Sequence, residues 1–142
     1  MKYLFAIFML LFNSSLFADN SRNILEISPL QIVKSYFAYD IEEAKNLPTR
    51  IDLEIEIEEV DLNNDNVNEI IAIFQHPYFC GRAGCRTVIL SKIPNNAWAP
   101  ILSNALSQDG VEVLKEIHNG FNVITLYGSN KWIMANGVYE IE

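Results

Sequence analysis

Oxygen-bearing side chains recur at short, regular spacing in one stretch of the 142-residue chain. Between Asp61 and Glu69 they stand at the first, third, fifth and ninth positions, on Asp61, Asn63, Asp65 and Glu69. Calcium takes about six to eight oxygen ligands, and a tight loop can present alternate side chains and a backbone carbonyl to one centre. With the carbonyl of Val67, these residues predict a calcium site. The alternative is an ion-free turn, because Asp and Asn favour turns for local hydrogen-bond reasons alone.

This stretch differs from the helix-flanked EF-hand loop. Its twelfth position is Ala72, where that loop needs a bidentate Glu, and the flanking segments have the pattern of strands. Asn66 occupies the place where such loops usually have Gly, and Asn is among the non-Gly residues that best tolerate left-handed backbone. We therefore expect a strand-flanked calcium loop.

Two cysteines, Cys80 and Cys85, are the whole cysteine content of the chain. Residues 1–18 have the pattern of an export signal, described below, and an even cysteine pair in an exported protein is expected to be oxidised. We therefore predict a disulfide, worth about 2 kcal/mol for so short a loop. Gly81 and Gly84 are expected to supply the positive φ that a tight return needs. A zinc site made with His76 and His118 is the alternative, and the wide separation of the two histidines disfavours it.

The loop around this cysteine pair also carries aromatic and cationic side chains. Tyr78, Phe79 and Arg82 lie in the connection between two predicted strands. Tyr and Arg are common at interface hot spots, and a cross-linked loop loses less entropy on docking. We predict a partner-binding tip here, with aromatics folded back over the sheet as the alternative.

Histidines and carboxylates form no recognisable catalytic motif. His76 and His118 each precede a turn signal, and neither a Gly-x-Ser-x-Gly nor a His-Glu-x-x-His pattern occurs. We therefore expect a protein that is not an enzyme, with weak hydrolysis of an envelope polymer as an open alternative.

The first eighteen residues have the composition of a signal peptide. Lys2 precedes an apolar run over residues 3–12, and small and polar residues lead to Ala18. The run is about half of the roughly 20 residues that span a membrane. We expect cleavage after Ala18, a mature domain over residues 19–142 without membrane association, and a location in the periplasm or outside the cell. A retained N-terminal anchor is the alternative.

The remaining periodicities predict helices first and strands after. Ser28 and Pro29 signal a helix start, and Asp40 with Glu43 signals a second, ended by Pro48. Residues 51–58 alternate Ile or Leu with acids, as a half-buried strand does, whereas residues 69–75 are apolar enough to be buried on both faces.

Further strands are expected at residues 86–93, 97–102, 111–117, 121–127, 132–135 and 138–141, with Asn-Gly hairpin turns at 119–120 and 136–137. The fold class is therefore α+β: N-terminal helices packed on an antiparallel β-meander, in a single domain. A small β-barrel and an incomplete propeller-like sheet are the alternatives.

The charge balance bears on partners. Eighteen acids against ten Lys and Arg give a net charge of -8, which argues against nucleic acid. An acidic surface favours a basic secreted or envelope protein, such as a cell-wall hydrolase or a delivered toxin, bound as inhibitors and immunity proteins bind theirs. A structural envelope domain without a protein client is the alternative.

The order of these features resembles that of small exported bacterial proteins of mostly unknown function. The shared elements are the Asp-x-Asn-x-Asp-x-x-x-Glu loop and the Cys-Gly-x-x-Gly-Cys loop in residues 61–90, and more weakly a closing hairpin within residues 119–139. The calcium-type loop alone is similar to those of integrin-type propeller repeats and dockerin-like modules. The resemblance implies a periplasmic α+β domain with a calcium loop and a disulfide, and it implies no reaction.

Overall fold

The computed structural model describes residues 27–126 and 130–142. The predicted signal peptide, residues 1–18, lies outside this part. No helix in the described ranges is long and apolar enough to span a lipid bilayer. The elements are α1 (Pro29–Tyr36), α2 (Ala38–Lys45), β1 (Glu54–Val60), β2 (Glu69–Gln75), β3 (Cys80–Gly81), β4 (Gly84–Lys92), β5 (Trp98–Ser107), β6 (Val111–His118), β7 (Phe121–Leu126), β8 (Lys131–Ala135) and β9 (Val138–Ile141).

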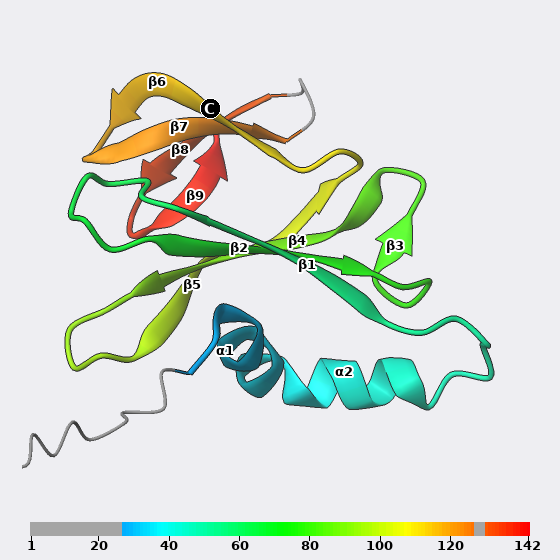
Figure 1. Ribbon diagram of the computed structural model, residues 1–142. Coiled ribbons are helices and arrows are strands. Elements are labelled where there is room, and N and C mark those ends of the chain that lie inside the picture. The colour runs from blue at the N-terminus through cyan, green and yellow to red at the C-terminus, as the bar shows by residue number, and fades with distance from the viewer. Residues whose placement is uncertain (1–26, 127–129) are drawn as a thin grey trace, which may run out of the picture.

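The strands form two antiparallel sheets instead of one continuous meander (Figure 1). The first sheet has the order β1-β2-β4-β3, with β5 also paired to β4, and the second has the order β6-β7-β8-β9. Of the predicted α+β fold, the antiparallel strands and the two short helices that precede them are confirmed, and the single meander sheet is wrong. After Ser107 the chain turns at Gly110, whose φ is +98°, and starts a new sheet.

The first helix begins as its sequence predicts. Ser28 is the N-cap: its hydroxyl accepts from the backbone N–H of Gln31, and the Gln31 side chain accepts from the N–H of Ser28. The second helix starts two residues before the predicted Asp40. The two helices meet at Phe37, where the backbone bends but helical hydrogen bonds continue. The N–H of Phe37 donates to the carbonyl of Val33, and the N–H of Ile41 donates to the carbonyl of Phe37.

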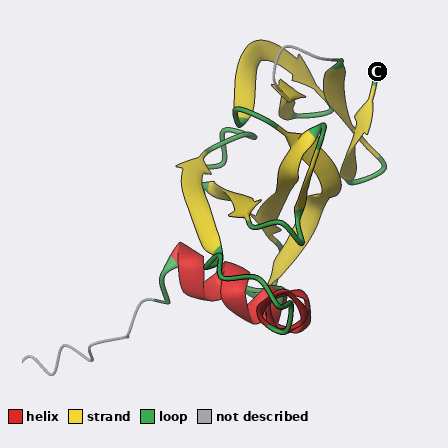
Figure 2. Ribbon diagram, turned by 90° about the vertical axis from the view of Figure 1, so that its right-hand side faces the viewer, coloured by secondary structure: helices red, strands yellow, loops and turns green. Residues whose placement is uncertain are grey.

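The first sheet has apolar side chains on both faces, and two core clusters result. The helices lie on one side of the strands, at the bottom of the view (Figure 2). Burial of β2 on both faces is confirmed. The cluster shared with the helices comprises Val33, Phe37, Ile41, Ala44, Ile70, Ala72, Phe74, Phe79, Val88 and Leu90. The cluster shared with the second sheet comprises Leu62, Ile71, Ile89, Ile101, Leu102, Ala105, Ile124, Leu126, Met134 and Tyr139.

A polar bridge joins α2 to β4 beside the first cluster. Arg86 donates to Asp40 at 2.8 Å and to the carbonyl of Ser103, and its guanidinium lies 5.0 Å from the ring centroid of Phe37. Asp40 thus lies in the first turn of its helix, where a carboxylate is favoured, and it pairs across to the sheet.

Both predicted Asn-Gly hairpins are confirmed. Asn119 and Gly120 have φ of +47° and +83°, and Asn136 and Gly137 have +52° and +85°. These turns join β6 to β7 and β8 to β9 with the positive φ that a type I′ turn requires.

Candidate functional site

The predicted calcium loop connects β1 to β2. Asn66 has φ of +65°, so its backbone adopts the left-handed conformation for which Gly is usual. Asn64 has φ of +59°, which the spacing alone did not indicate. The two left-handed residues curl the chain so that backbone N–H groups point inward.

Asp61 is held by these inward N–H groups. Its Oδ1 accepts from the backbone of Asn63 and Asp65, each at 3.2 Å, and its Oδ2 accepts from the backbone of Asn66 at 2.9 Å. Desolvation raises the pKa of Asp61, but the hydrogen bonds from the backbone outweigh it, and the pKa is lowered from its ordinary value. The carboxylate is therefore kept ionised and fixed in orientation.

Glu69 is the buried carboxylate of the loop, with 1 % of its surface exposed. Its Oε2 accepts from the backbone N–H of Leu62 at 2.8 Å, and its Oε1 accepts from the hydroxyl of Ser91 at 2.9 Å. Desolvation by burial raises the pKa of Glu69, and the charges of Asp65 and Asp61 add to the rise, against the two hydrogen bonds. A bound cation would relieve this cost.

Ser91 is a partner that sequence reasoning missed. It follows Val88, Ile89 and Leu90 in β4 and is itself buried. A small hydroxyl residue ending a buried apolar run is the only signal that could have pointed to it.

The amide of Asn63 lies between the remaining acids of the loop. Its Nδ2 donates to Asp65 at 3.0 Å and to Glu69 at 3.3 Å, while the N–H of Val67 donates to Asp65 at 2.8 Å. Among the described residues no three acidic, histidine or cysteine side chains gather as a metal group in this arrangement. The oxygens suit a hard cation by type, and the Asn63 amide must turn to admit one.

The predicted disulfide between Cys80 and Cys85 is confirmed. It joins paired positions of β3 and β4, so neither sulfur is free for zinc. The two histidines have different partners: His76 contacts Thr49, and His118 contacts the carbonyl of Met134 in the second sheet. The zinc alternative is therefore wrong.

Only one of the two glycines of this loop has positive φ. Gly84 has φ of +115°, and a Cβ there would lie 2.2 Å from the carbonyl oxygen of Ser107. Gly81 has open space around it and lies outside the left-handed region. The expectation of positive φ at Gly81 is corrected, since the close approach of β5 constrains Gly84 alone.

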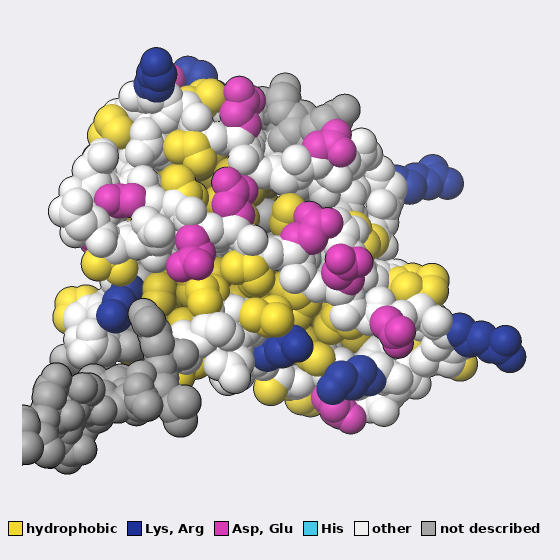
Figure 3. All heavy atoms as spheres, viewed as in Figure 1, with side chains coloured by type: hydrophobic (Ala, Val, Ile, Leu, Met, Phe, Trp, Pro, Cys, Tyr) yellow, Lys and Arg dark blue, Asp and Glu magenta, His cyan; other side chains and the backbone are white. Residues whose placement is uncertain are grey.

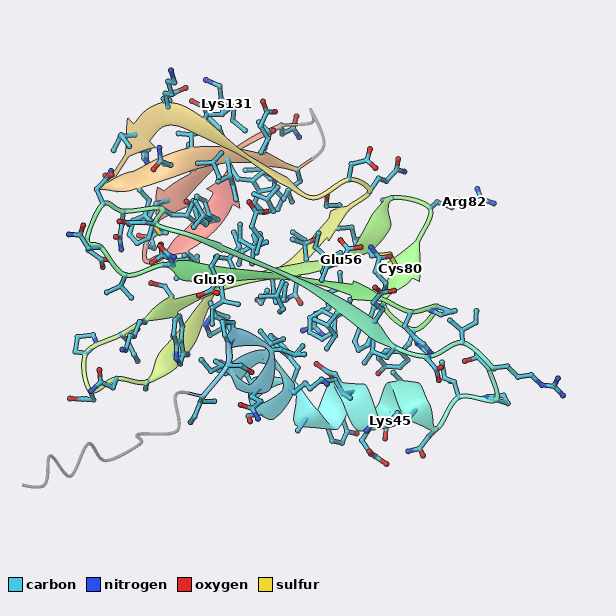
Figure 4. The ribbon with its side chains drawn as sticks, viewed as in Figure 1. Lys45, Glu56, Glu59, Cys80, Arg82 and Lys131 are labelled. Atoms are coloured by element: carbon cyan, nitrogen blue, oxygen red, sulfur yellow. A yellow bond between two sulfur atoms is a disulfide. The ribbon has the colours of Figure 1, made fainter. Side chains whose placement is uncertain are left out.

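The three predicted partner-binding residues separate into surface and core. Tyr78 is 43 % exposed, and Arg82 is exposed and points away from the body of the molecule (Figure 4). Phe79 is 5 % exposed because its N–H bonds to the carbonyl of His76 and turns its ring onto Phe74, at 4.8 Å between centroids. The accessible tip is therefore Tyr78 and Arg82.

His76 organises this turn from inside. It is buried, and its Nδ1 accepts from the backbone N–H of Tyr78 at 3.2 Å. With Nδ1 as acceptor, the proton of the neutral ring is on Nε2, which donates to the hydroxyl of Thr49. The ring is thus occupied on both nitrogens by structural bonds.

In the described part of the chain, the glutamates of β1 have no ion-pair partner. Glu54, Glu56 and Glu58 are exposed on one face of β1, and Glu56 accepts one bond from Gln75, whereas Glu59 is exposed on the face that Ile70 shares with the helical cluster. No ion pair between residues 27–126 and 130–142 involves these four carboxylates. Acidic side chains lie along this strand, above an apolar hollow bordered by lysines (Figure 3).

Comparison of the chain with protein-family models, with curated proteins and with solved structures finds no match.

Proposed function

We propose that the chain is an exported, non-enzymatic binding domain for a basic protein, acting as inhibitors and immunity proteins do. The observation that carries the proposal is the set of exposed glutamates on β1, which form no ion pair with any other residue that the structure describes. Like charges in a row repel one another, and a cationic partner removes that repulsion. The pattern of residues 1–18 and the disulfide support a location in the periplasm or outside the cell.

Charge also supports fast association. The net charge of -8 produces a field that attracts a cationic protein from a distance, and this raises the association rate in low salt. Tyr78 and Arg82 supply a second contact point at the end of the sheet where β1 begins, because Gln75 pairs with Glu54 just before the disulfide loop. Their hairpin is cross-linked, so docking costs little ordering.

The calcium loop has a structural part in this proposal. Asp61, Asn63, Asp65 and Glu69, with the carbonyl of Val67, would hold the ion, which would neutralise the acids where β1 turns into β2. Two N-terminal helices packed on the first sheet would complete the α+β domain. The ion would offset the repulsion between the carboxylates of the loop, and the ordered loop would hold β1 in position.

A binding measurement with a basic wall hydrolase tests the proposal. Protein exported and purified from an expression host is immobilised, and lysozyme is titrated at about 50 and 300 mM salt. We expect binding that weakens with salt, and that Glu54→Lys with Glu58→Lys weakens at least about tenfold. The control with equal charge change, Asp109→Lys with Glu140→Lys, should bind within about twofold of wild type.

A second variant addresses the loop tip. Tyr78→Ala with Arg82→Ala should also weaken binding, with an unchanged melting temperature because both side chains are exposed. If neither lysozyme nor any protein of an envelope extract is retained by wild type, the binding function is overturned and a structural domain without a client is favoured. Turnover of peptidoglycan or ester substrates by the purified protein would overturn the non-enzymatic assignment.

A further inference from the structure

The free edge of β1 lies beside an apolar groove. β1 pairs with β2 on one side, and on its other side no backbone hydrogen bond joins it to any residue of the described ranges. In an antiparallel strand every second residue directs its N–H and C=O away from the paired neighbour, so this edge offers a row of unmet donors and acceptors.

The groove has a volume of about 700 Å³ and runs between this edge and the two helices. Its apolar floor is formed by Leu30, Ala38, Ile41, Leu53 and Ile55. Lys34 and the ion pair of Lys45 with Glu42 border it on the helical side, whereas Asp52 and Glu54 border it on the strand side. The space-filling view shows this apolar hollow directly beneath the row of acids (Figure 3).

We propose that this edge and groove take an extended segment of a basic protein, which adds to the first sheet as a strand next to β1. The inference rests on the proposed function and names the mode of binding. An added strand lies about 4.8 Å from β1, and its side chains alternate between two faces. One set of side chains then covers the apolar floor, while the other lies beside Glu54, Glu56 and Glu58.

The two faces specify the chemistry of the segment. On the face with Ile55 and Ile57, which pack on the helical cluster, apolar side chains are required. On the face with the glutamates, Lys or Arg are required, because cross-strand neighbours of opposite charge attract. The expected ligand is therefore a strand of alternating basic and apolar residues.

A second copy of the chain fits this edge poorly. Antiparallel pairing of β1 with itself about a two-fold axis normal to the sheet places the glutamates of both copies on one face, where they repel. The acids that exclude self-pairing are the same ones that attract a cationic strand. Charge complementarity therefore selects a foreign basic segment.

Synthetic peptides test the mode directly. A fluorescent, end-capped seven-residue peptide alternating Lys and Val is compared with one having the same residues in two blocks, at about 150 mM salt. We expect the alternating peptide to bind at least tenfold tighter. Two further peptides carry N-methyl groups, one on the backbone of its inner Lys residues and the other on the backbone of its Val residues. Only one of these two sets of N–H groups faces β1 in an added strand. We therefore expect one N-methylated peptide to lose binding and the other to keep its affinity within a few-fold.

Protein variants locate the peptide. Ala38→Phe fills the groove and should weaken binding at least tenfold, while Ala97→Phe, in the exposed turn between β4 and β5 and outside the groove lining, should leave it unchanged. Equal affinity for both peptides, or equal effects of both N-methyl series, would overturn strand addition in favour of diffuse charge attraction. Dimers that the alternating peptide fails to dissociate would overturn it in favour of a second copy.

The two proposals fail separately. Peptide binding without affinity for basic globular proteins would overturn the proposed function and keep the strand site. Binding of lysozyme without discrimination between the peptides would keep the function and overturn the site. No binding of the alternating peptide up to about 1 mM overturns the site outright.

Discussion

The backbone of Leu62 is bonded to Asn122, and this contact joins the predicted calcium loop to the second sheet. The N–H of Asn122 donates to the carbonyl of Leu62 at 2.7 Å, and the N–H of Leu62 donates to Glu69. The hydroxyl of Tyr139 donates in turn to the carbonyl of Asn122 at 2.7 Å. Burial raises the pKa of Tyr139, and the nearby charge of Glu69 adds to the rise. Order in the loop and attachment of the second sheet are therefore coupled.

Loss of the Leu62 side chain should weaken both sheets together. Leu62 is fully buried in the cluster between them. We expect Leu62→Ala to lower the free energy of unfolding by about 2 to 5 kcal/mol, the usual cost of a cavity at a buried leucine. Urea unfolding followed by Trp fluorescence and far-UV dichroism measures this. Leu106→Ala, at a side chain that is 44 % exposed, is the control and should change stability far less.

Replacement of Glu69 by Gln should stabilise the protein at neutral pH when calcium is chelated. The folded-state pKa of Glu69 is raised above its ordinary value of 4.5, so between these values the folded protein binds more protons than the unfolded chain. Stability therefore falls as pH rises through that interval. Glu69→Gln removes the charge while keeping an acceptor for Leu62, and we expect a gain on the order of 1 kcal/mol.

The pH profile separates Glu69 from Asp61. The pKa of Asp61 is lowered below 3.8, so its contribution is present above 3.8 and is lost as pH falls through the folded value. Chelated wild type should thus gain stability as pH falls from neutral toward 4.5, the ordinary pKa of Glu69, and lose it in stronger acid. In Glu69→Gln the first change should shrink while the second persists. An identical profile in both proteins would show that Glu69 is not the group responsible.

Calcium should raise the melting temperature, and Asp65→Ala should abolish the rise. For affinities of extracellular modules, about 10⁻⁴ to 10⁻³ M, 10 mM calcium adds roughly 1.4 to 2.7 kcal/mol to the free energy of unfolding. Magnesium should do less, because it keeps its own water and prefers octahedral geometry. Scanning calorimetry measures the shift. Asp109→Ala, a change of one exposed acid in another turn, should retain it.

Local chemistry explains which features could be predicted. The capping box of Ser28 and Gln31 and the Asn-Gly turns at 119 and 136 depend only on neighbouring residues, and each formed as expected. The alternation of β1 likewise needs no knowledge of its partners. Burial of Glu69 against Ser91 depends instead on strand register. Ile70 pairs with Leu90, so the next pair along the two antiparallel strands places the hydroxyl of Ser91 opposite Glu69.

Long-range contacts explain what could not be predicted. The break between the two sheets after Ser107 follows from which face of the first sheet the later strands cover, and strand spacing alone does not encode that face. Phe79 fits a binding tip by type, yet Phe74 lies beneath it and takes it into the core. Aromatic side chains near a turn are divided between core and surface by such packing.

The disulfide hairpin offers a matched pair of glycine substitutions. Gly84→Ala requires an L side chain at φ of +115° and places its Cβ 2.2 Å from the backbone oxygen of Ser107, which belongs to the paired strand and cannot rotate away. Gly81→Ala meets no atom within 4 Å. We expect Gly84→Ala to lower the free energy of unfolding by more than about 2 kcal/mol, because positive φ and backbone displacement both cost energy.

The control in this pair is Gly81→Ala, which should leave stability within about 0.5 kcal/mol of wild type. Urea unfolding of the oxidised proteins, with thiol titration to verify the Cys80–Cys85 bond, measures both. Equal stability of the two variants would contradict the close approach of Ser107 to Gly84. If Gly81→Ala alone strongly lowered the free energy of unfolding, Gly81 and not Gly84 would be the residue with positive φ, because a residue with positive φ is the one that a Cβ strains.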